Sequence, residues 1–496
     1  MTKTRETIDK MSSGVHVKTD ETETCPGVGR RRFLKGVFAL GGGAAVCPAM
    51  TGGGLFAAPA PGTDGDDQLD YPVKDLGCKT SRQITVALMG AGQRGQVYVR
   101  YAERYPDVMK VVAVSDVNAH RREKVAAKHG IPADRRFGDF HEMLAAGRLA
   151  DAMIISLPDD LHYEPAMAAM SQGYDLLLEK PMAQREQECL DMLKRQRETG
   201  AIVGVCHVLR YAPYFQALKS AIADGLVGDV VSVQHMEPIE YAHMAHSYVR
   251  GNWHSSKETT PIILAKSCHD LDIVKWLVGR RCERVSAEGS LGLFRAENAP
   301  AGAPARCTDG CPHEATCPWS AIDIYGRRRA HMYVFDLPEG YTRDDVMEKL
   351  RTTPYGRCVF RCDNDQCDHY VATMLFDGGV TATLSMEAFT PWGGRRTRIM
   401  GTKGFIEGDG KRFNLWDFRS GKRRAWAKNV AEIAEYKGSG HGGGDLALVR
   451  DFMLAVDKRD ESLLSSSLAA SVESHVMGFA CEKSRLGSEK VAVNVS

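Results

Sequence analysis

Ile84-Thr-Val-Ala-Leu-Met-Gly-Ala-Gly-Gln-Arg-Gly95 is the stretch of this sequence that decides the fold. Its first six residues are apolar or β-branched and carry no charge, as a strand buried on both faces of a sheet requires. They lead directly into a GxGxxG pattern and then into a helical pattern from Gln96 to Arg104. A strand, a glycine turn and a helix in this order predict a Rossmann-type α/β domain that binds a dinucleotide.

The three glycines of this turn have separate physical roles. Gly90 makes the tight turn, Gly92 lets the backbone approach a pyrophosphate, and Gly95 lets the helix pack closely on the strand. The helix N-terminus then offers unpaired N–H groups and a partial positive charge to the phosphates. We therefore predict that Gly90, Gly92, Gln93, Arg94 and Gly95 contact the cofactor.

A second uncharged strand, Val111 to Ser115, ends on Asp116. This acid follows Gly90 by 26 residues, close to the spacing of about 20 at which a carboxylate binds the ribose hydroxyls. The context favours a nucleotide site over an ordinary glycine turn, and it favours NAD. Arg121 and Arg122 follow closely and would accommodate a 2′-phosphate, so NADP stays an alternative.

The length and charge of the chain limit the number of its domains and the kinds of partner it can bind. A chain of 496 residues is too long for one hydrophobic core and predicts two or more domains. Its 64 basic and 63 acidic residues give a net charge of +1, which provides no general attraction for polyanions. We therefore expect no nucleic-acid partner.

The N-terminal region resembles a twin-arginine export signal. Arg30-Arg31-Arg32-Phe33-Leu34-Lys35 precedes an uncharged, glycine-rich stretch from Gly36 to Gly62. Its glycines and alanines make a poor membrane-spanning helix, so we expect no stable membrane anchor. We predict a signal region at 1–60, engagement of the twin-arginine export machinery, and a periplasmic or extracellular location. An exported enzyme would find no soluble nicotinamide pool, so it should keep its nucleotide bound.

Sequence patterns divide the remaining chain. A linker rich in Gly, Pro and Asp is expected at 61–82, followed by the NAD(P)-binding Rossmann domain at 83–207. Alternating strand patterns and a hairpin signal at Asp377-Gly-Gly379 then predict an α+β domain at 208–496, with a largely antiparallel, open-faced sheet. A cysteine-rich insertion is expected within it, at about 288–367.

Two further motifs carry a resemblance that runs from about residue 83 to the C-terminus. With the glycine turn, Glu179-Lys180-Pro181 and His269-Asp270-Leu-Asp272 resemble the glucose-fructose oxidoreductase/inositol dehydrogenase (Gfo/Idh/MocA) family. The resemblance implies NAD(P)-dependent oxidation or reduction of a sugar or cyclic polyol, in a protein that forms homo-oligomers. It also implies that Lys180 lies beside the nicotinamide, with Glu179 at the cofactor.

The chemistry of these residues supports that assignment. A lysine cation at the carboxyl end of a strand favours the alkoxide that forms as hydride leaves a carbinol carbon. His269 is suited to proton transfer because the ordinary pKa of histidine lies near neutrality. We therefore expect Lys180 and His269 to be the catalytic pair.

Other polar residues are candidates for substrate contact. Similar enzymes carry an aspartate four residues before this histidine, but here the position is Ala265, which leaves the proton-transfer roles open. The neighbouring Lys266 would supply charge to the substrate instead. The other candidate substrate residues are His162, His207, Arg210 and Asp270. By resemblance, His441 and Asp445 would lie near the substrate, unless their glycine-rich loop is purely structural.

Two alternative functions stay open. One is a glycosidase in which NAD transiently oxidises the sugar, the glycosidic bond is lost by elimination, and the hydride returns. The other is a nucleotide-holding binding protein without turnover, which the absence of the usual aspartate would permit.

Six of the 14 cysteines fall between Cys307 and Cys367, in two triads. Disulfides would fit an exported protein. A structural zinc site would fit the clustering, with Cys307, Cys311, Cys317 and Cys362 as ligands. An iron–sulfur cluster would fit a route that exports folded protein, and free thiols are the remaining alternative. Disulfides, a zinc site or an iron–sulfur cluster would each cross-link an insertion that shows no obvious core of its own.

Overall fold

The computed structural model describes residues 67–495. The expected signal region at 1–60, with Arg30 and Arg31, lies outside these residues. No helix within 67–495 has both the length and the apolar character needed to cross a bilayer.

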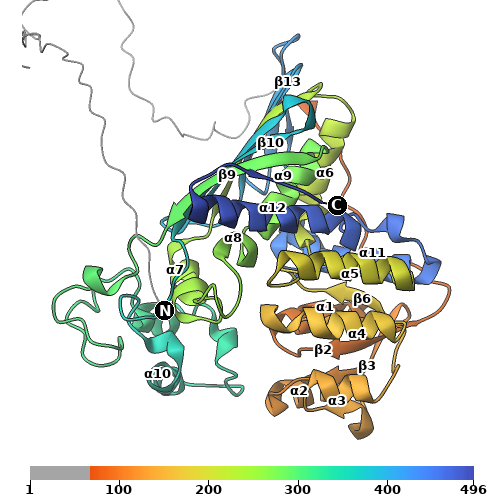
Figure 1. The fold of residues 1–496 in the computed structure, drawn as a ribbon. Coiled ribbons are helices and arrows are strands. Elements are labelled where there is room, and N and C mark those ends of the chain that lie inside the picture. The colour runs from red at the N-terminus through yellow and green to blue at the C-terminus, as the bar shows by residue number, and fades with distance from the viewer. Residues whose placement is uncertain (1–66, 496) are drawn as a thin grey trace, which may run out of the picture. The chain divides into compact units, whose positions relative to one another are not determined.

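The first sheet has six parallel strands in the order β4-β3-β2-β5-β6-β7 (Figure 1). It follows from the uncharged runs of the sequence, because β2, β5 and β6 are almost completely buried on both faces. The strands are β2 (Ile84–Met89), β3 (Met109–Ser115), β4 (Arg136–Phe137), β5 (Ala152–Ile155), β6 (Asp175–Leu178) and β7 (Val203–Val205).

Helices connect these strands and cover the sheet. They are α1 (Gln93–Arg104), α2 (Ala119–His129), α3 (Phe140–Ala145), α4 (Tyr163–Ser171) and α5 (Glu186–Thr199). The expected domain at 83–207 is completed by a helix from the end of the chain, α11 (Gly444–Lys458). Leu448, Phe452 and Met453 of α11 join Val86 and Leu88 of β2 in one hydrophobic core.

The second sheet has ten strands and is mostly antiparallel, as expected. Its order is β1-β15-β14-β13-β12-β8-β11-β10-β9-β16, and only the β1–β15 and β8–β11 pairs are parallel. The strands are β1 (Asp67–Gln68), β8 (Val230–Pro238), β9 (Cys282–Ser290), β10 (His369–Phe376), β11 (Thr381–Glu387), β12 (Arg396–Gly401), β13 (Gly404–Gly408), β14 (Phe413–Asp417), β15 (Arg423–Trp426) and β16 (Val491–Ala492).

Helices on one side of the large sheet join the two parts of the fold. Figure 1 shows α12 (Leu468–Gly487) running between the large sheet and α5, and it contacts both β9 and α5. The other helices of this half are α6 (Pro213–Ala223), α7 (Tyr241–Met244), its π-helical continuation η4 (Ala245–Arg250), α8 (Ile262–Ala265) and α9 (Cys268–Val278). Helix α10 (Arg343–Thr352) lies in the cysteine-rich insertion. A single turn, η3 (Val208–Tyr211), follows β7.

The cysteine-rich insertion is a long excursion between two paired strands. Ser290 of β9 lies opposite His369 of β10, so the chain leaves the sheet at Leu291 and returns at Asp368. The insertion has an aromatic core, which the sequence pattern did not reveal. Trp319 packs edge-on against both Phe294 and Phe360, and a second aromatic group forms around Tyr325.

The part of the expected linker that the structure describes is packed onto the fold. Asp67 and Gln68 pair with β15, and Leu76 is completely buried in the core of the nucleotide domain. Residues 67–82 therefore bind along both parts of the fold, because their few apolar side chains find sites there.

Candidate active site

The glycine turn has the geometry of a phosphate cradle. Gly90 has a φ of +88°, and a Cβ at Gly95 would overlap the carbonyl oxygen of Gly90. A Cβ at Gly92 would meet nothing within 4 Å, so the backbone there borders open space. The N-terminus of α1 has no side-chain cap and no acid in its first turn. Its N–H groups are therefore available to an anion, and the turn fits the pyrophosphate of a dinucleotide.

Asp116 lies beside this turn. Its carboxylate accepts hydrogen bonds from the backbone N–H groups of Ala91 and Asn118, both at 2.7 Å. Each carboxylate oxygen has a second lone pair, so the side chain still has acceptor sites for ribose hydroxyls. The position matches the expected ribose contact.

Arg94 and Glu179, both expected at the cofactor, bind each other instead. Nε of Arg94 is 2.7 Å from Oε1 of Glu179, which also accepts a hydrogen bond from the hydroxyl of Tyr98. Burial would raise the pKa of Glu179, but Arg94 and Lys180 lower it below its usual value. Glu179 is thus a buried anion that fixes the end of β6 to α1.

The same arginine connects the turn to the C-terminal part of the chain. Nη2 of Arg94 is 2.9 Å from Oδ1 of Asp445, at the start of α11. Asp445 in turn binds Nδ1 of His441 at 2.9 Å, and the His441 ring lies 5.6 Å from the His269 ring. His441 therefore lies beside His269, and its expected place near the substrate stays a prediction.

Lys180 follows Glu179 at the carboxyl end of β6, in a cis peptide with Pro181. Its Nζ donates a 2.7 Å hydrogen bond to the carbonyl oxygen of Ala265. The backbone of Ala265 thus contacts the lysine at the position where similar enzymes carry an aspartate.

Asp159 is a buried acid near this lysine. The indole of Trp253 and the hydroxyl of Thr260 each donate a hydrogen bond to it at 3.1 Å. Burial raises its pKa, and the charge of Lys180 opposes that shift. Asp159 is not among the residues expected at the site, although its place after β5, in a loop at the ligand-facing edge of the sheet, was a usable signal.

His269 lies in the first turn of α9 and is only 4% exposed. Its Nδ1 has no hydrogen-bond partner among the described residues. Burial, followed by the charge of Lys180, lowers its pKa well below the usual value. The imidazole is therefore neutral at pH 7, and a neutral imidazole accepts a proton.

Lys266 and Asp270, expected at the substrate, are members of one buried ion-pair network. Nζ of Lys266 is 3.2 Å from Glu237, and Nε of Arg395 is 2.6 Å from Glu237 and 2.9 Å from Asp270. Asp270 is fully buried and also binds His235, at 3.0 Å. Asp270 therefore orients Arg395, while Lys266 and Arg395, which are 14% and 12% exposed, remain accessible.

Arg395 is a site residue that the sequence analysis missed. Its Nη2 has no hydrogen-bond partner among the described residues, and its charge helps to lower the pKa of His269. Gly393-Gly394 before it marks a loop, but the sequence gives no sign that this loop lies beside α9.

His162 serves the backbone. Its Nδ1 and Nε2 lie 2.7 Å and 2.9 Å from the carbonyl oxygens of Pro181 and Leu157. Both ring nitrogens are therefore engaged, and the side chain is fully buried. His162 positions the segment that carries Lys180, which replaces its expected role in contacting the substrate.

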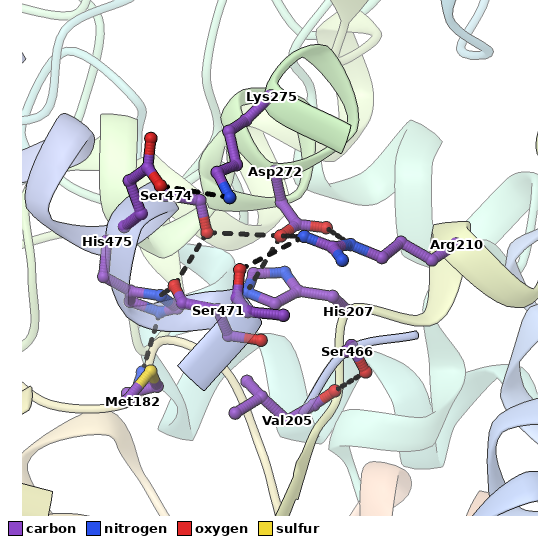
Figure 2. A network of polar contacts seen from close by, with 12 residues as sticks. Met182, Val205, His207, Arg210, Asp272, Lys275, Ser466, Ser471, Ser474 and His475 are labelled. Atoms are coloured by element: carbon purple, nitrogen blue, oxygen red, sulfur yellow. Dashed lines mark hydrogen bonds and ion pairs between the residues drawn. The ribbon is translucent and has the colours of Figure 1, made fainter. Parts of the chain in front are cut away.

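His207 and Arg210 belong to a buried scaffold behind the site (Figure 2). Arg210 forms two 2.6 Å hydrogen bonds with Asp272 of α9, and Ser474 of α12 donates a third, at 3.2 Å. The ring of His207 lies 5.9 Å from that of His269, and burial lowers its pKa to about 3. These residues fix α9 against the nucleotide domain, and Arg210 is too enclosed to reach a substrate.

Comparison with known proteins agrees with this geometry. Residues 84–207 match the Gfo/Idh/MocA model described as "Oxidoreductase family, NAD-binding Rossmann fold", and residues 219–493 match the model for its "C-terminal alpha/beta domain". The protein YteT of Bacillus subtilis is 27% identical over 337 residues, which cover 64% of this chain and 75% of that protein.

Two further proteins resemble this chain, one in sequence and one in fold. Inositol 2-dehydrogenase of Klebsiella pneumoniae is 28% identical over 196 residues, which cover 39% of this chain and only 54% of the dehydrogenase. The WlbA dehydrogenase of Bordetella pertussis, solved with NADH and UDP-GlcNAcA, has a similar fold. Its TM-score is 0.59 at 19% identity, and the alignment covers 84% of this chain and all of that one.

Two glycine substitutions test the cradle separately from the fold. Gly95→Ala should destabilise the nucleotide domain by about 1–3 kcal/mol, because its methyl group overlaps Gly90.

Gly92→Ala should leave the melting temperature unchanged, since its φ is −69° and its methyl group meets no protein atom. It should nevertheless weaken NAD binding about tenfold or more. Thermal unfolding measures the stability of the two variants, and calorimetry measures their affinity for NAD. Equal NAD affinity in Gly92→Ala and the parent would refute the assignment of the glycine turn as the phosphate cradle.

Proposed function

The chain belongs to the Gfo/Idh/MocA oxidoreductase family, and from that premise we propose that it oxidises or reduces a secondary hydroxyl of a neutral sugar or cyclic polyol. NAD, when bound, supplies the hydride acceptor or donor. The observation that carries the proposal is the placement of Lys180, bound to the carbonyl oxygen of Ala265, near enough to the buried His269 for its charge to help lower the pKa of the histidine.

The two residues have complementary roles. The Lys180 cation stabilises negative charge on the substrate oxygen as hydride leaves the adjacent carbon. His269, held neutral by burial, accepts the hydroxyl proton. The ring of His441 lies beside that of His269, Asp445 binds His441, and Arg94 binds Asp445.

Charge balance supports a neutral substrate. Lys266 and Arg395 are the partly accessible members of the ion-pair network, and Glu237 and Asp270 neutralise them. The acid of Asp159 similarly faces the charge of Lys180. Among residues 67–495, these pairings balance the charges of Lys266, Arg395 and Lys180, so a substrate carboxylate or phosphate would not be favoured. The N–H groups of Lys266 and Arg395 suit polyol hydroxyls.

A product assay with neutral sugars, glycosides and cyclic polyols tests the reaction class. The proposal predicts NADH formation with at least one free sugar or polyol. Release of free monosaccharide from a glycoside without net NADH would instead identify the redox-assisted glycosidase.

The role of Lys180 is tested with Lys180→Met. Turnover should fall at least about a hundredfold, because the substitution removes the cation at the reacting oxygen. NAD affinity should remain close to that of the parent, since the phosphate cradle is untouched. The exposed Lys257→Met is the matched control and should retain full activity. A Lys180→Met protein with a turnover number like that of the parent would contradict the assignment.

We also propose that the site prefers NAD to NADP, because the insertion neutralises the arginine that would bind a 2′-phosphate. Nη2 of Arg121 is 2.8 Å from Oδ2 of Asp336, and Nε of Arg121 is 3.0 Å from both oxygens of this acid. Nδ2 of Asn118, two residues beyond Asp116, also donates to Asp336, at 3.2 Å. A carboxylate thus stands beside the expected ribose position, where it would repel a phosphate.

Asp336→Asn tests this preference. Asparagine preserves the side-chain volume and tolerates the positive φ of +46° at this position, but it removes the charge. The ratio of NADP to NAD affinity should rise about tenfold or more, as expected for a freed charge-assisted hydrogen bond of about 1.5–3 kcal/mol. The exposed Asp344→Asn in the same insertion is the control. An unchanged ratio in Asp336→Asn, measured by calorimetry, would refute the role of Asp336.

A further inference from the structure

Four cysteines of the insertion line one small cavity. Cys307, Cys311, Cys317 and Cys358 border a space of about 20 Å³, large enough for one water-sized occupant. Backbone hydrogen bonds hold the two contributing segments together, since Cys307 N–H donates to Gly356 and Cys358 N–H donates to Ala305. The cavity is therefore built by two chain segments about fifty residues apart in the sequence.

A buried cation without an anion borders the same cavity. Arg250, at the end of η4, is only 2% exposed and lines the cavity with the cysteines. Its Nη2 lies 3.8 Å from Sγ of Cys307 and donates to the carbonyl oxygen of Trp319. Its Nη1 has no hydrogen-bond partner, and no carboxylate within residues 67–495 forms an ion pair with it. A buried guanidinium without a counter-ion carries a high desolvation cost.

The thiols do not supply that counter-ion as long as they are protonated. All the cysteines within residues 67–495 are free, so the expected disulfides are not present in the structure. Metal binding would change the charge, because a coordinated thiol is deprotonated.

We propose that Cys307, Cys311, Cys317 and Cys358 bind a single thiolate-preferring divalent ion, for which zinc is the best match. Four thiolates and one Zn²⁺ carry a net charge of −2, which the guanidinium of Arg250 partly offsets. The volume of the cavity fits one ion. In the described residues no group of three or more Cys, His, Asp or Glu side chains is already arranged to hold a metal. The four side chains must therefore turn inward to reach the Zn–S distance of about 2.3 Å.

The structure changes the fourth ligand that the sequence suggested. Cys362 does not line the cavity, and its Sγ donates to the carbonyl oxygen of Cys358 at 3.3 Å. Cys358 takes its place because its segment pairs with the segment of Cys307. Binding at this place would tie together the two ends of the insertion that carries Asp336.

The test measures metal in the full-length protein after purification and dialysis against a chelator. The proposal predicts about one zinc per chain by elemental analysis, and X-ray absorption at the zinc edge should show about four sulfur neighbours at about 2.3 Å. Cys358→Ser should lose most of the metal, whereas Cys362→Ser should retain it. The absorption measurement uses the parent protein, so it stands even if Cys358→Ser fails to fold.

Three results would overturn the proposal. Protein free of metal after dialysis would show an adventitious ion only. Iron with acid-labile sulfide would identify a cluster in place of a single ion. Equal metal loss in Cys358→Ser and Cys362→Ser, or a zinc edge dominated by nitrogen and oxygen neighbours, would exclude the ligand set.

Discussion

The buried ion pair between Arg94 and Glu179 is the interaction on which the rest of the site depends. Arg94 comes from the helix of the glycine turn, and Glu179 directly precedes Lys180. The same guanidinium binds Asp445 of α11, which fixes His441 beside His269. One arginine thus sets the phosphate cradle, the lysine and the histidine relative to one another. Removing Arg94 would leave the buried carboxylate of Glu179 without its ion-pair partner, which costs several kcal/mol.

In the proposed mechanism, His269 accepts the proton and Lys180 stabilises negative charge, and burial separates these two roles. His269 loses its proton because it is enclosed and lies near cations, whereas Lys180 is held against the carbonyl oxygen of Ala265. A neutral acceptor for the hydroxyl proton, close to a cation that stabilises the alkoxide, suits the removal of hydride from an alcohol. The carboxylates around the site serve mainly to hold the cations. The mechanism that we propose therefore needs no aspartate in the place of Ala265.

Local patterns predicted the elements of the fold, but they could not predict contacts between distant residues. The stretch from Ile84 to Gly95 identified the strand, the turn and the dinucleotide site because each feature depends on neighbouring residues. Motifs drew attention to Arg94, Glu179 and Asp270, but their ion-pair partners lie on other elements and could not be predicted. Arg395 and Asp336 belong to no sequence motif. The folding of their loops brings Arg395 to Asp270 of α9 and Asp336 to Arg121. The choice of Cys358 over Cys362 depends in the same way on strand-like pairing across the insertion.

The central claim, that burial keeps His269 neutral beside Lys180, is tested most directly by the pH dependence of hydride transfer in a single turnover. Because the pKa of His269 is lowered, its proton-accepting form should persist as the pH falls through the ordinary histidine value of about 6.5. The rate of NADH formation should therefore stay flat between about pH 7.5 and pH 6, and decline only at lower pH. A tenfold loss of rate per pH unit that begins near pH 6.5 would contradict the account.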